Sequence, residues 1–129
     1  MKSIQTKILT PYGPVFDGQA EGVNLPGSEG AFEVKYNHAN IMAMLDIGKV
    51  LIRTNDGNKV YSVSGGFVEV FKNQLTILAE SAESTDKIDV ERARRAKEAA
   101  EKQIKESKVK DVAAELALKR AINRLNLAG

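Results

Sequence analysis

The stretch from Val60 to Leu78, with the sequence VYSVSGGFVEVFKNQLTIL, decides the fold of this 129-residue chain. Its β-branched and aromatic residues predict two or three short strands, interrupted by Gly65-Gly66 and by a turn at Lys72-Asn73-Gln74. Apolar residues occur on both faces: Tyr61, Val63, Phe67 and Phe71 on one, Val68 and Val70 on the other. We therefore expect this stretch to be buried on both sides, in the middle of a sheet.

Shorter strand signals precede this stretch and are separated by turn residues. They cover residues 4–10, 15–16, 21–25, 31–35, 41–45 and 49–54. Residues 26–30, Pro-Gly-Ser-Glu-Gly, indicate a loop, and residues 55–58, Asn-Asp-Gly-Asn, indicate a hairpin turn. No gap between successive segments is long enough for the crossover of about a dozen residues that parallel strands require, so we expect largely antiparallel pairing. The pattern predicts an all-β N-terminal sandwich or flattened barrel of short antiparallel strands.

From Asp86 onward the pattern changes from strands to helices. Helix-forming residues dominate, and neither glycine nor proline occurs again before Gly129. The charge changes at the same point, because residues 1–85 carry 7 basic and 9 acidic side chains, whereas residues 86–129 carry 12 basic and 8 acidic ones. We therefore expect a β-sandwich domain over residues 1–85 and an antiparallel α-helical hairpin over residues 86–129.

Two aspartates mark the starts of the predicted helices. Asp89 is placed as the N-cap of the first helix, and Asp111 as the N-cap of the second, after a break at residues 107–111. A short turn between two such helices indicates a hairpin. Isolated short helices are marginal in water, so we expect this hairpin to be stable only when docked. A switch between two docked positions is then a reasonable hypothesis.

The composition excludes several classes of site. The chain has no cysteine and one histidine, His38, which excludes disulfides, thiolate chemistry and a histidine-based metal or catalytic cluster. We expect neither catalytic residues nor a metal site, because no nucleophile–base set or metal-ligand spacing occurs. Acids interleave with the bases of the hairpin and no aromatic residue follows Phe71, so we expect no nucleic-acid binding. No apolar run reaches the roughly 18 residues of a membrane helix, so we expect membrane association only through partners.

Segments along the whole chain carry a resemblance to a known family. They are Leu9-Thr10-Pro11, residues 26–30, His38-Ala39, residues 64–70 (SGGFVEV), residues 88–93 (IDVERA) and residues 115–121 (ELALKRA). In this order and spacing, the chain resembles the epsilon subunit of bacterial F-type ATP synthase. It departs from the family at residues 33–38, where a Gly-Ile-Leu-Pro-Gly-His-like run is usual, and at Asn40, where proline is usual. We therefore expect this loop to differ in shape from the family's loop.

The resemblance implies a non-catalytic rotor subunit in the central stalk of a proton-translocating ATP synthase, at the cytoplasmic face of the bacterial cell membrane. The sandwich would bind the gamma subunit and rest on the c-subunit ring, which the loop over residues 26–30 would contact. The hairpin would lie against the sandwich in one position. Extended along gamma, it would meet the catalytic beta and alpha subunits through Lys119, Arg120 and Arg124 and inhibit ATP hydrolysis.

The resemblance also implies a regulatory ATP site in the hairpin, with no cofactor required. The family's motif is Ile or Leu, Asp, two variable residues, Arg and Ala, and residues 88–93 match it. The candidate ligands are Glu83, Ile88, Asp89, Arg92, Ala93, Arg120 and Arg124. Arg120 and Arg124 are one helical turn apart, and their forked guanidinium groups suit phosphate oxygens. An arginine that the family has two turns after Arg92 is replaced by Ala99. The alternative is that Asp89 is only an N-cap and the arginines are solvated.

The alternative function for the whole chain is a free-standing β-sandwich binding module with a helical interaction arm. Copurification with a gamma subunit distinguishes the two functions, because only the rotor subunit requires that partner.

Overall fold

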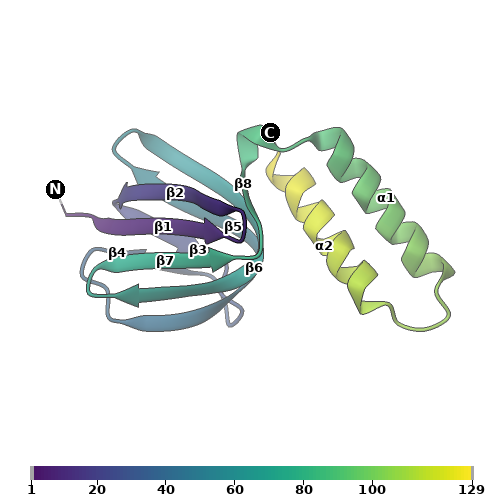
Figure 1. Cartoon of the computed structure of the whole chain (residues 1–129), viewed down its shortest axis with the longest axis horizontal. Helices are drawn as coiled ribbons and strands as arrows, with labels where there is room; N and C mark the ends of the chain where they lie inside the picture. Colours follow the sequence, from purple (N-terminus) through teal and green to yellow (C-terminus); the bar gives the residue numbers. More distant parts are fainter. Residues whose placement is uncertain (1, 129) are drawn as a thin grey trace. The chain divides into compact units, whose positions relative to one another are not determined.

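The computed structural model describes residues 2–128 and divides the chain into two compact units. The first unit, Met1–Ser84, is built from strands, and the second, Thr85–Gly129, from helices (Figure 1). The expected fold class, a strand-built N-terminal domain followed by two C-terminal helices, is confirmed.

The strands form one mixed sheet in the order β2-β1-β7-β6-β5-β3-β4, with β8 paired to β6. Their bounds are β1 Ile4–Thr10, β2 Gly13–Ala20, β3 Gly22–Leu25, β4 Phe32–Lys35, β5 Ile41–Thr54, β6 Gly57–Phe71, β7 Gln74–Ala79 and β8 Ala82–Ser84. Every pair is antiparallel except β1 with β7, which is parallel. We expected largely antiparallel pairing because the connections between successive strands are short. Strands β1 and β7 are not successive, since most of the domain lies between them in the sequence, so a short connection does not restrict their relative direction.

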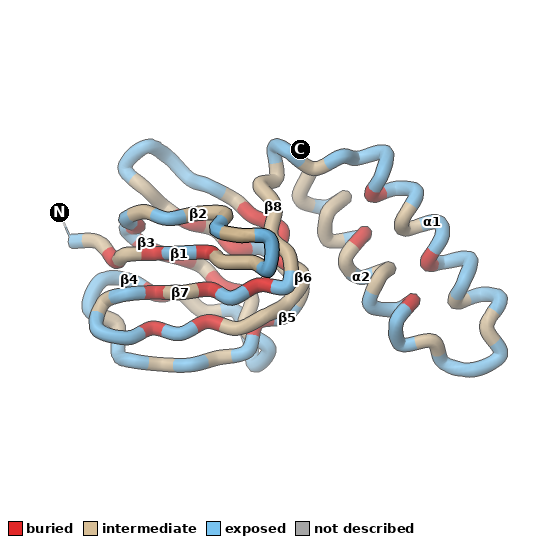
Figure 2. The backbone as a smooth tube through the Cα atoms, in the orientation of Figure 1, coloured by how far each residue is buried: buried red, intermediate tan, exposed pale blue. Residues whose placement is uncertain are grey.

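The two long strands β5 and β6 each belong to two layers of the sandwich. Residues 41–45 of β5 pair with residues 66–70 of β6, and this half of the sheet continues through β7 and β1 to β2. Residues 47–54 of β5 pair with residues 57–64 of β6, and this half continues to β3, β4 and β8. Both halves contain buried residues, drawn in red in Figure 2, and these residues belong to a single hydrophobic core. The sequence had indicated two separate strands at 41–45 and 49–54, but Gly48 lies inside the continuous strand β5.

Gly65 and Gly66 turn β6 over at the junction of the two layers. Before them the buried apolar residues are Tyr61 and Val63, and after them Val68 and Val70, so the inward-facing apolar positions change from odd to even. Both glycines have positive φ, +99° and +142°, a region that other residues rarely adopt. The expectation that this stretch is buried on both faces is wrong for its second half, where Phe71 is 51% exposed. In the first half, Ser62 is buried between Tyr61 and Val63.

Asparagine side chains fix the loop that departs from the family pattern. The β6–β7 turn consists of Lys72 and Asn73, both with positive φ as a type I′ turn requires, so Gln74 already belongs to β7. Asn40 Oδ1 accepts a hydrogen bond from the Lys72 amide at 3.0 Å, and Asn73 Oδ1 accepts one from the Asn37 amide at 3.0 Å. The residue that replaces proline thus ties its loop to the neighbouring turn.

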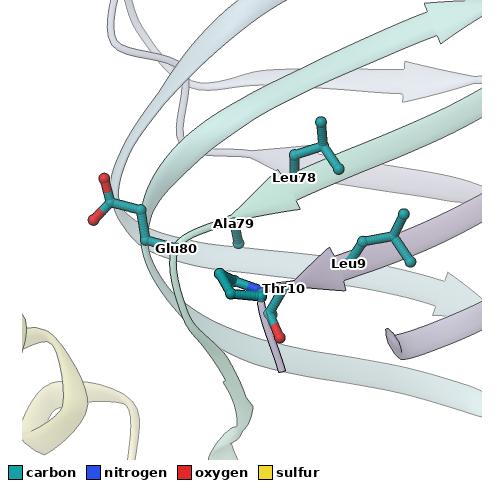
Figure 3. A pocket seen from close by; sticks show the side chains of 6 residues that line it. Leu9, Thr10, Leu78, Ala79 and Glu80 are labelled. Carbon is teal, nitrogen blue, oxygen red and sulfur yellow. The ribbon is translucent and has the colours of Figure 1, made fainter. Parts of the chain in front are cut away.

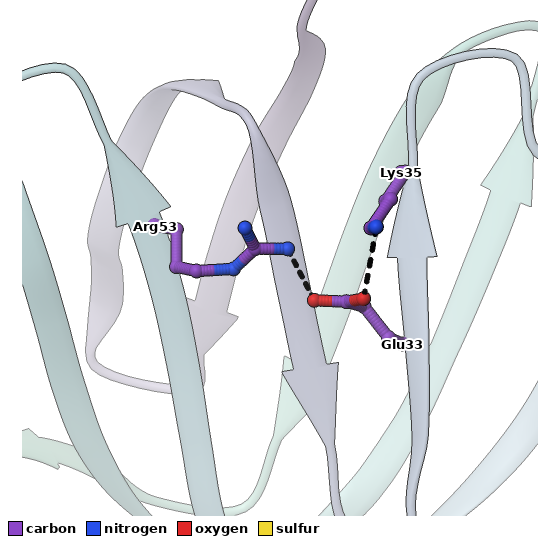
Figure 4. A network of polar contacts seen from close by, with 3 residues as sticks. All are labelled: Glu33, Lys35 and Arg53. Carbon is purple, nitrogen blue, oxygen red and sulfur yellow. Dashed lines mark hydrogen bonds and ion pairs between the residues drawn. The ribbon is translucent and has the colours of Figure 1, made fainter.

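An ion-pair network crosses three strands of the second layer (Figure 4). Gly22 on β3 lies between its register partners, Lys35 on β4 and Arg53 on β5. Because Gly22 has no side chain, the Arg53 guanidinium reaches across β3 and pairs with Glu33 on β4, where a Cβ on Gly22 would overlap it. Lys35 Nζ lies 3.5 Å from the other oxygen of Glu33. Partial burial raises the pKa of Glu33, but the hydrogen bond and charge of Arg53, together with Lys35, outweigh that effect and hold it below its ordinary value.

The second unit contains the 3-10 turn η1 Thr85–Lys87 and two helices, α1 Val90–Glu106 and α2 Val112–Leu127. Both predicted N-caps are confirmed: Asp89 Oδ1 accepts from the Arg92 amide and Asp111 Oδ1 from the Ala114 amide, each at 3.0 Å. The fully buried residues of the described part of this unit are alanines spaced seven apart, Ala93 and Ala100 on α1 and Ala114 and Ala121 on α2. Small side chains let the two helices approach closely, and the packing buries little apolar area.

Gly66→Ala should destabilise the strand unit more than Gly65→Ala. Both variants force a non-glycine residue to positive φ, which costs about 1–2 kcal/mol. A Cβ at Gly66 would also overlap the backbone carbonyl oxygen of Leu78, whereas at Gly65 the nearest atom, Leu45 O, is 3.7 Å away. We expect a total of about 2–4 kcal/mol for Gly66→Ala. Urea unfolding followed by tyrosine fluorescence measures this, because every tyrosine lies in residues 1–84. Equal losses for the two variants would contradict the overlap.

The Glu33–Arg53 pair should make stability depend on pH. A carboxyl whose pKa is lowered by folding adds stability above its unfolded pKa, about 4.3, and this contribution disappears as the pH falls through the folded value. We therefore expect wild type to be more stable than Glu33→Gln at pH 7, and the difference to disappear as the pH falls through the lowered folded pKa of Glu33. Partial exposure of both side chains keeps the effect small. Arg53→Gln should cause the same loss, and the double variant no further loss; additive losses would show that the two side chains are not coupled.

Candidate functional site: an apolar sheet face and a hairpin end

An apolar row crosses four strands on the outer surface of the first layer. Met44 on β5 pairs with Phe67 on β6, Phe67 with Leu78 on β7, and Leu78 with Leu9 on β1. Their sequence neighbours Leu45, Val68, Ile77 and Ile8 point inward and are buried. Since side chains alternate along a strand, the row itself points away from the core. Met44 is 63% exposed and Leu78 is 44% exposed.

Two further residues extend this row toward the β6–β7 turn. Met42 is 67% exposed and Phe71 is half-exposed, and both have the outward-facing register. They border a depression of about 290 Å³ lined by residues 40–42 and 69–71. We call the six residues Leu9, Met42, Met44, Phe67, Phe71 and Leu78 the outer apolar face.

The outer apolar face has the character of a protein-binding surface. Contiguous exposed apolar patches are uncommon on soluble monomers and mark interaction sites. Methionine side chains adapt to irregular partner surfaces, and phenylalanine supplies a large contact area. The sequence already contained the signal, in the period-2 alternation of Met42 and Met44 with inward residues. The sequence analysis does not identify this face, because it predicts that Phe67 and Phe71 are buried.

The loop over residues 26–30 is fixed beside this face. The Ser28 amide donates to Met44 O at 2.9 Å, and the Asp46 amide donates to Pro26 O at 2.8 Å. Glu29 and Gly30 project as its exposed part. The loop is therefore a rigid projection, with no helix following it.

His38 makes local contacts. Its amide donates to Lys35 O at 3.1 Å, and its Nδ1 lies 2.7 Å from Ala39 O. Within residues 2–128, no group of three or more histidine, cysteine, aspartate or glutamate side chains is arranged to hold a metal ion.

Most of the candidate nucleotide residues of the second unit lie toward one end of the hairpin. Antiparallel packing brings the start of α1, with Asp89 and Arg92, to the same end as the last turn of α2, with Arg124 (Figure 1). Arg120 lies one turn before Arg124, near the middle of α2. Arg92 is exposed, whereas Arg120 and Arg124 are partly buried. The Asp89 carboxylate is engaged as the N-cap. Ile88 precedes this cap and is half-buried, while Ala93 is buried.

Glu83 belongs to β8 in the other unit, where it pairs with Ser62. Glu83 is therefore described with the strand unit, and the hairpin alone contains the other six candidate residues. The hairpin offers three guanidinium groups and the positive end of α1, which match the charge of a triphosphate.

Neither helix among residues 2–128 combines the length and apolar character that crossing a membrane requires.

Comparison with known proteins covers both units. Residues 3–85 match the family described as "ATP synthase, Delta/Epsilon chain, beta-sandwich domain", and residues 86–129 match "ATP synthase, Delta/Epsilon chain, long alpha-helix domain". The ATP synthase epsilon chain of Bacillus pumilus is 45% identical over 130 residues, covering 100% of this chain and 99% of the relative. The epsilon chain of Bacillus velezensis is 43% identical over 131 residues, covering 100% and 99%.

A solved structure shows the same fold at lower sequence identity. In the cryo-EM structure of the Euglena gracilis mitochondrial ATP synthase, containing OSCP, F1 and the c-ring, one chain superposes with a TM-score of 0.83 at 20% identity. The alignment covers 95% of this chain and 79% of that chain. With the two family models together matching residues 3–129 and the relatives aligned from end to end, the chain belongs to the delta/epsilon chain family of ATP synthase.

Proposed function

We propose that this chain is a non-catalytic rotor subunit in the central stalk of a proton-translocating F-type ATP synthase. It joins the gamma subunit to the c-subunit ring and inhibits ATP hydrolysis through its helical hairpin. The observation that carries the proposal is the outer apolar face, an exposed binding surface on a rigid strand unit of a chain from this family. A chain in the cryo-EM structure of the central stalk and c-ring of the Tetrahymena thermophila mitochondrial ATP synthase has a similar fold, with a TM-score of 0.59 at 16% identity.

The outer apolar face is the surface we assign to gamma. Its side chains project from four paired strands, so their spacing is fixed by the hydrogen-bond register. A preorganised face loses little conformational freedom on binding. Removing large apolar side chains such as Met44, Phe67 and Leu78 from water provides the driving force, about 25 cal/mol per Å² of apolar surface.

The loop over residues 26–30 is assigned to the c ring. Two backbone hydrogen bonds hold it against β5, so it can transmit force without yielding. Contact with the ring would place the chain at the cytoplasmic face of the membrane as a peripheral subunit. The same arrangement makes the chain part of the rotor without giving it any reaction of its own.

The hairpin is suited to move. Its fully buried side chains are alanines, while Val112, Leu116 and Ile122 on α2 keep about two-fifths or more of their surface in water. Such a hairpin gains little free energy from burial, about 1.5–3 kcal/mol for each large side chain that becomes fully covered. An alternative site that covers these side chains, along gamma and between the beta and alpha subunits, therefore competes effectively. In that position Lys119, Arg120 and Arg124 would face acidic segments.

ATP would bias the hairpin toward one position. Arg92, Arg120 and Arg124 would hold the phosphates, with Asp89 fixing the start of α1 and Ile88 and Ala93 completing the site. A ligand at 100 times its dissociation constant stabilises the state that binds it by about 2.7 kcal/mol. This free energy is comparable to that gained by burying one or two large side chains. Bound ATP can therefore decide which of its two positions the hairpin occupies.

Removing residues 88–129 should release inhibition of ATP hydrolysis in the assembled complex. The strand unit keeps the outer apolar face and should still couple gamma to the ring. The measurement compares ATP hydrolysis and ATP-driven proton pumping of the complex with and without these residues. Increased hydrolysis with retained pumping is expected. Unchanged hydrolysis would contradict the inhibitory role, and failure of the full-length chain to copurify with gamma would favour a free-standing binding module.

Titration of ATP into the full-length protein should release heat, and Arg92→Ala should weaken binding about tenfold or more, the effect of losing one charged phosphate contact. Arg95→Ala is the matched control, since Arg95 is also an exposed arginine on α1 but falls outside the family motif. Calorimetry at millimolar ATP measures both. No heat from wild type, or equal losses for the two variants, would remove the ATP site.

A further inference from the structure

The chain contains two Asp-Gly pairs, Asp17-Gly18 and Asp56-Gly57, in different structural settings. An aspartyl side chain reacts with its own backbone most readily when glycine follows it, because glycine has no Cβ to hinder the approach of its nitrogen. The reaction needs a free carboxyl group, an accessible glycine and a backbone that can leave its hydrogen-bonded geometry. The two pairs differ in all three respects.

Asp17-Gly18 is held inside strand β2. Gly18 is in register with Thr6 on β1, and Asp17 Oδ1 accepts a hydrogen bond from Gln5 Nε2 at 2.7 Å. The ring of Phe16 covers Gly18, since a Cβ on this glycine would lie 3.3 Å from it. Backbone inside a paired strand opens only rarely. The fold therefore protects Asp17 from this reaction.

Asp56-Gly57 lies at the tip of the β5–β6 hairpin. Residues 55–59 are exposed, and a Cβ on Gly57 would meet no atom within 4 Å. Among residues 2–128, no group forms a hydrogen bond or ion pair with the Asp56 carboxylate. The Thr54 hydroxyl braces the turn, because it donates to Gly57 O at 2.7 Å and accepts from the Asp56 amide at 3.1 Å. Both bonds are exposed, so the tip can open without disturbing the core.

We propose that Asp56-Gly57 is a site of isoaspartate formation. The Gly57 nitrogen attacks Cγ of the protonated Asp56 carboxyl, loses its proton and expels the hydroxyl as water, which closes a five-membered succinimide ring. Water then adds to one of the two ring carbonyls and breaks its bond to the nitrogen. Cleavage at the main-chain carbonyl leaves the chain running through the side chain, as isoaspartate, whereas cleavage at the side-chain carbonyl restores aspartate. One water is released and one is consumed, so the step needs no cofactor.

Isoaspartate would add one carbon to the backbone between Thr54 and Gly57. The two hydrogen bonds of the Thr54 hydroxyl span this segment, so the longer backbone would loosen the turn. The first buried residues on either side of the tip are Ile52 and Tyr61, which keep their places in the core. The modified chain should therefore remain folded. This site uses neither the outer apolar face nor the hairpin, so it does not depend on the proposed function.

The β1–β2 turn has the same arrangement without an aspartate. Thr10, at the end of β1 (Figure 3), donates to Gly13 O at 3.0 Å and accepts from the Tyr12 amide at 3.1 Å. Gly13 and Gly57 have similar φ, +118° and +112°. Tyr12 holds the position equivalent to Asp56 and is 93% exposed. Tyr12→Asp would therefore place an Asp-Gly pair in an equivalent turn of the same protein.

The test incubates the full-length chain in neutral buffer at physiological temperature and measures isoaspartate by enzymatic methylation and peptide mapping. Trypsin releases Asp56 in residues 54–59 and Asp17 in residues 8–35, so the two sites are read separately. Isoaspartate should form at Asp56 about tenfold faster than at Asp17 or more, because β2 must open before Asp17 can react. In urea the two sites should react at similar rates, since the unfolded chain protects neither.

Two variants complete the test, and circular dichroism melting checks that each is folded. Asp56→Glu should abolish the signal from residues 54–59, because a glutamyl side chain would have to close a less favourable six-membered ring. Tyr12→Asp should form isoaspartate at position 12 at a rate close to that of Asp56. Equal rates at Asp56 and Asp17 in the folded chain, no isoaspartate at Asp56, or an inert Tyr12→Asp turn would each overturn the proposal.

Discussion

The structure depends on a reversal of side-chain direction at Gly65-Gly66. Two paired strands, β5 and β6, pass from one layer of the sandwich to the other, and their inward positions must change parity on the way. Glycine is required because the backbone adopts positive φ and, at Gly66, lies against the carbonyl of Leu78. Without the reversal, Phe67 would point inward and no apolar row could form outside.

The same constraint explains what the sequence could predict and what it could not. Most strand positions, a hairpin turn within residues 55–58 and both helix caps follow from local signals, such as alternation, turn residues and an aspartate before a helical run. Strand β2 is longer than the predicted residues 15–16, and β8 was not predicted. Which face of β6 is buried is not local, because it depends on the strand turning over between Val63 and Val68. A pattern with apolar residues on both faces fits two-sided burial and a change of buried face equally well. The parallel β1–β7 pair was missed for a similar reason, since distant strands meet there.

The two candidate sites differ in the same way, because a local sequence motif predicts one and the other depends on the fold. The candidate nucleotide residues came from a sequence motif, and the structure places Asp89, Arg92 and Arg124 toward one end of the hairpin, with Arg120 one turn earlier in α2. The outer apolar face came from exposure and register, which the sequence does not state. At Asn40, where the family usually has proline, the sequence predicted only a loop of different shape, and the structure shows that the Asn40 side chain accepts a hydrogen bond from the Lys72 amide.

The two units need opposite mechanical properties, and their packing supplies them. A surface that carries torque must keep its shape, and the strand unit does so by burying Ile, Leu and Val side chains from both layers in one core. In the proposed function, the hairpin must leave its position at small cost. Its fully buried residues are alanines in the part of the unit that the structure describes, and its two caps keep the helices formed. Low burial of this kind suits an arm that moves.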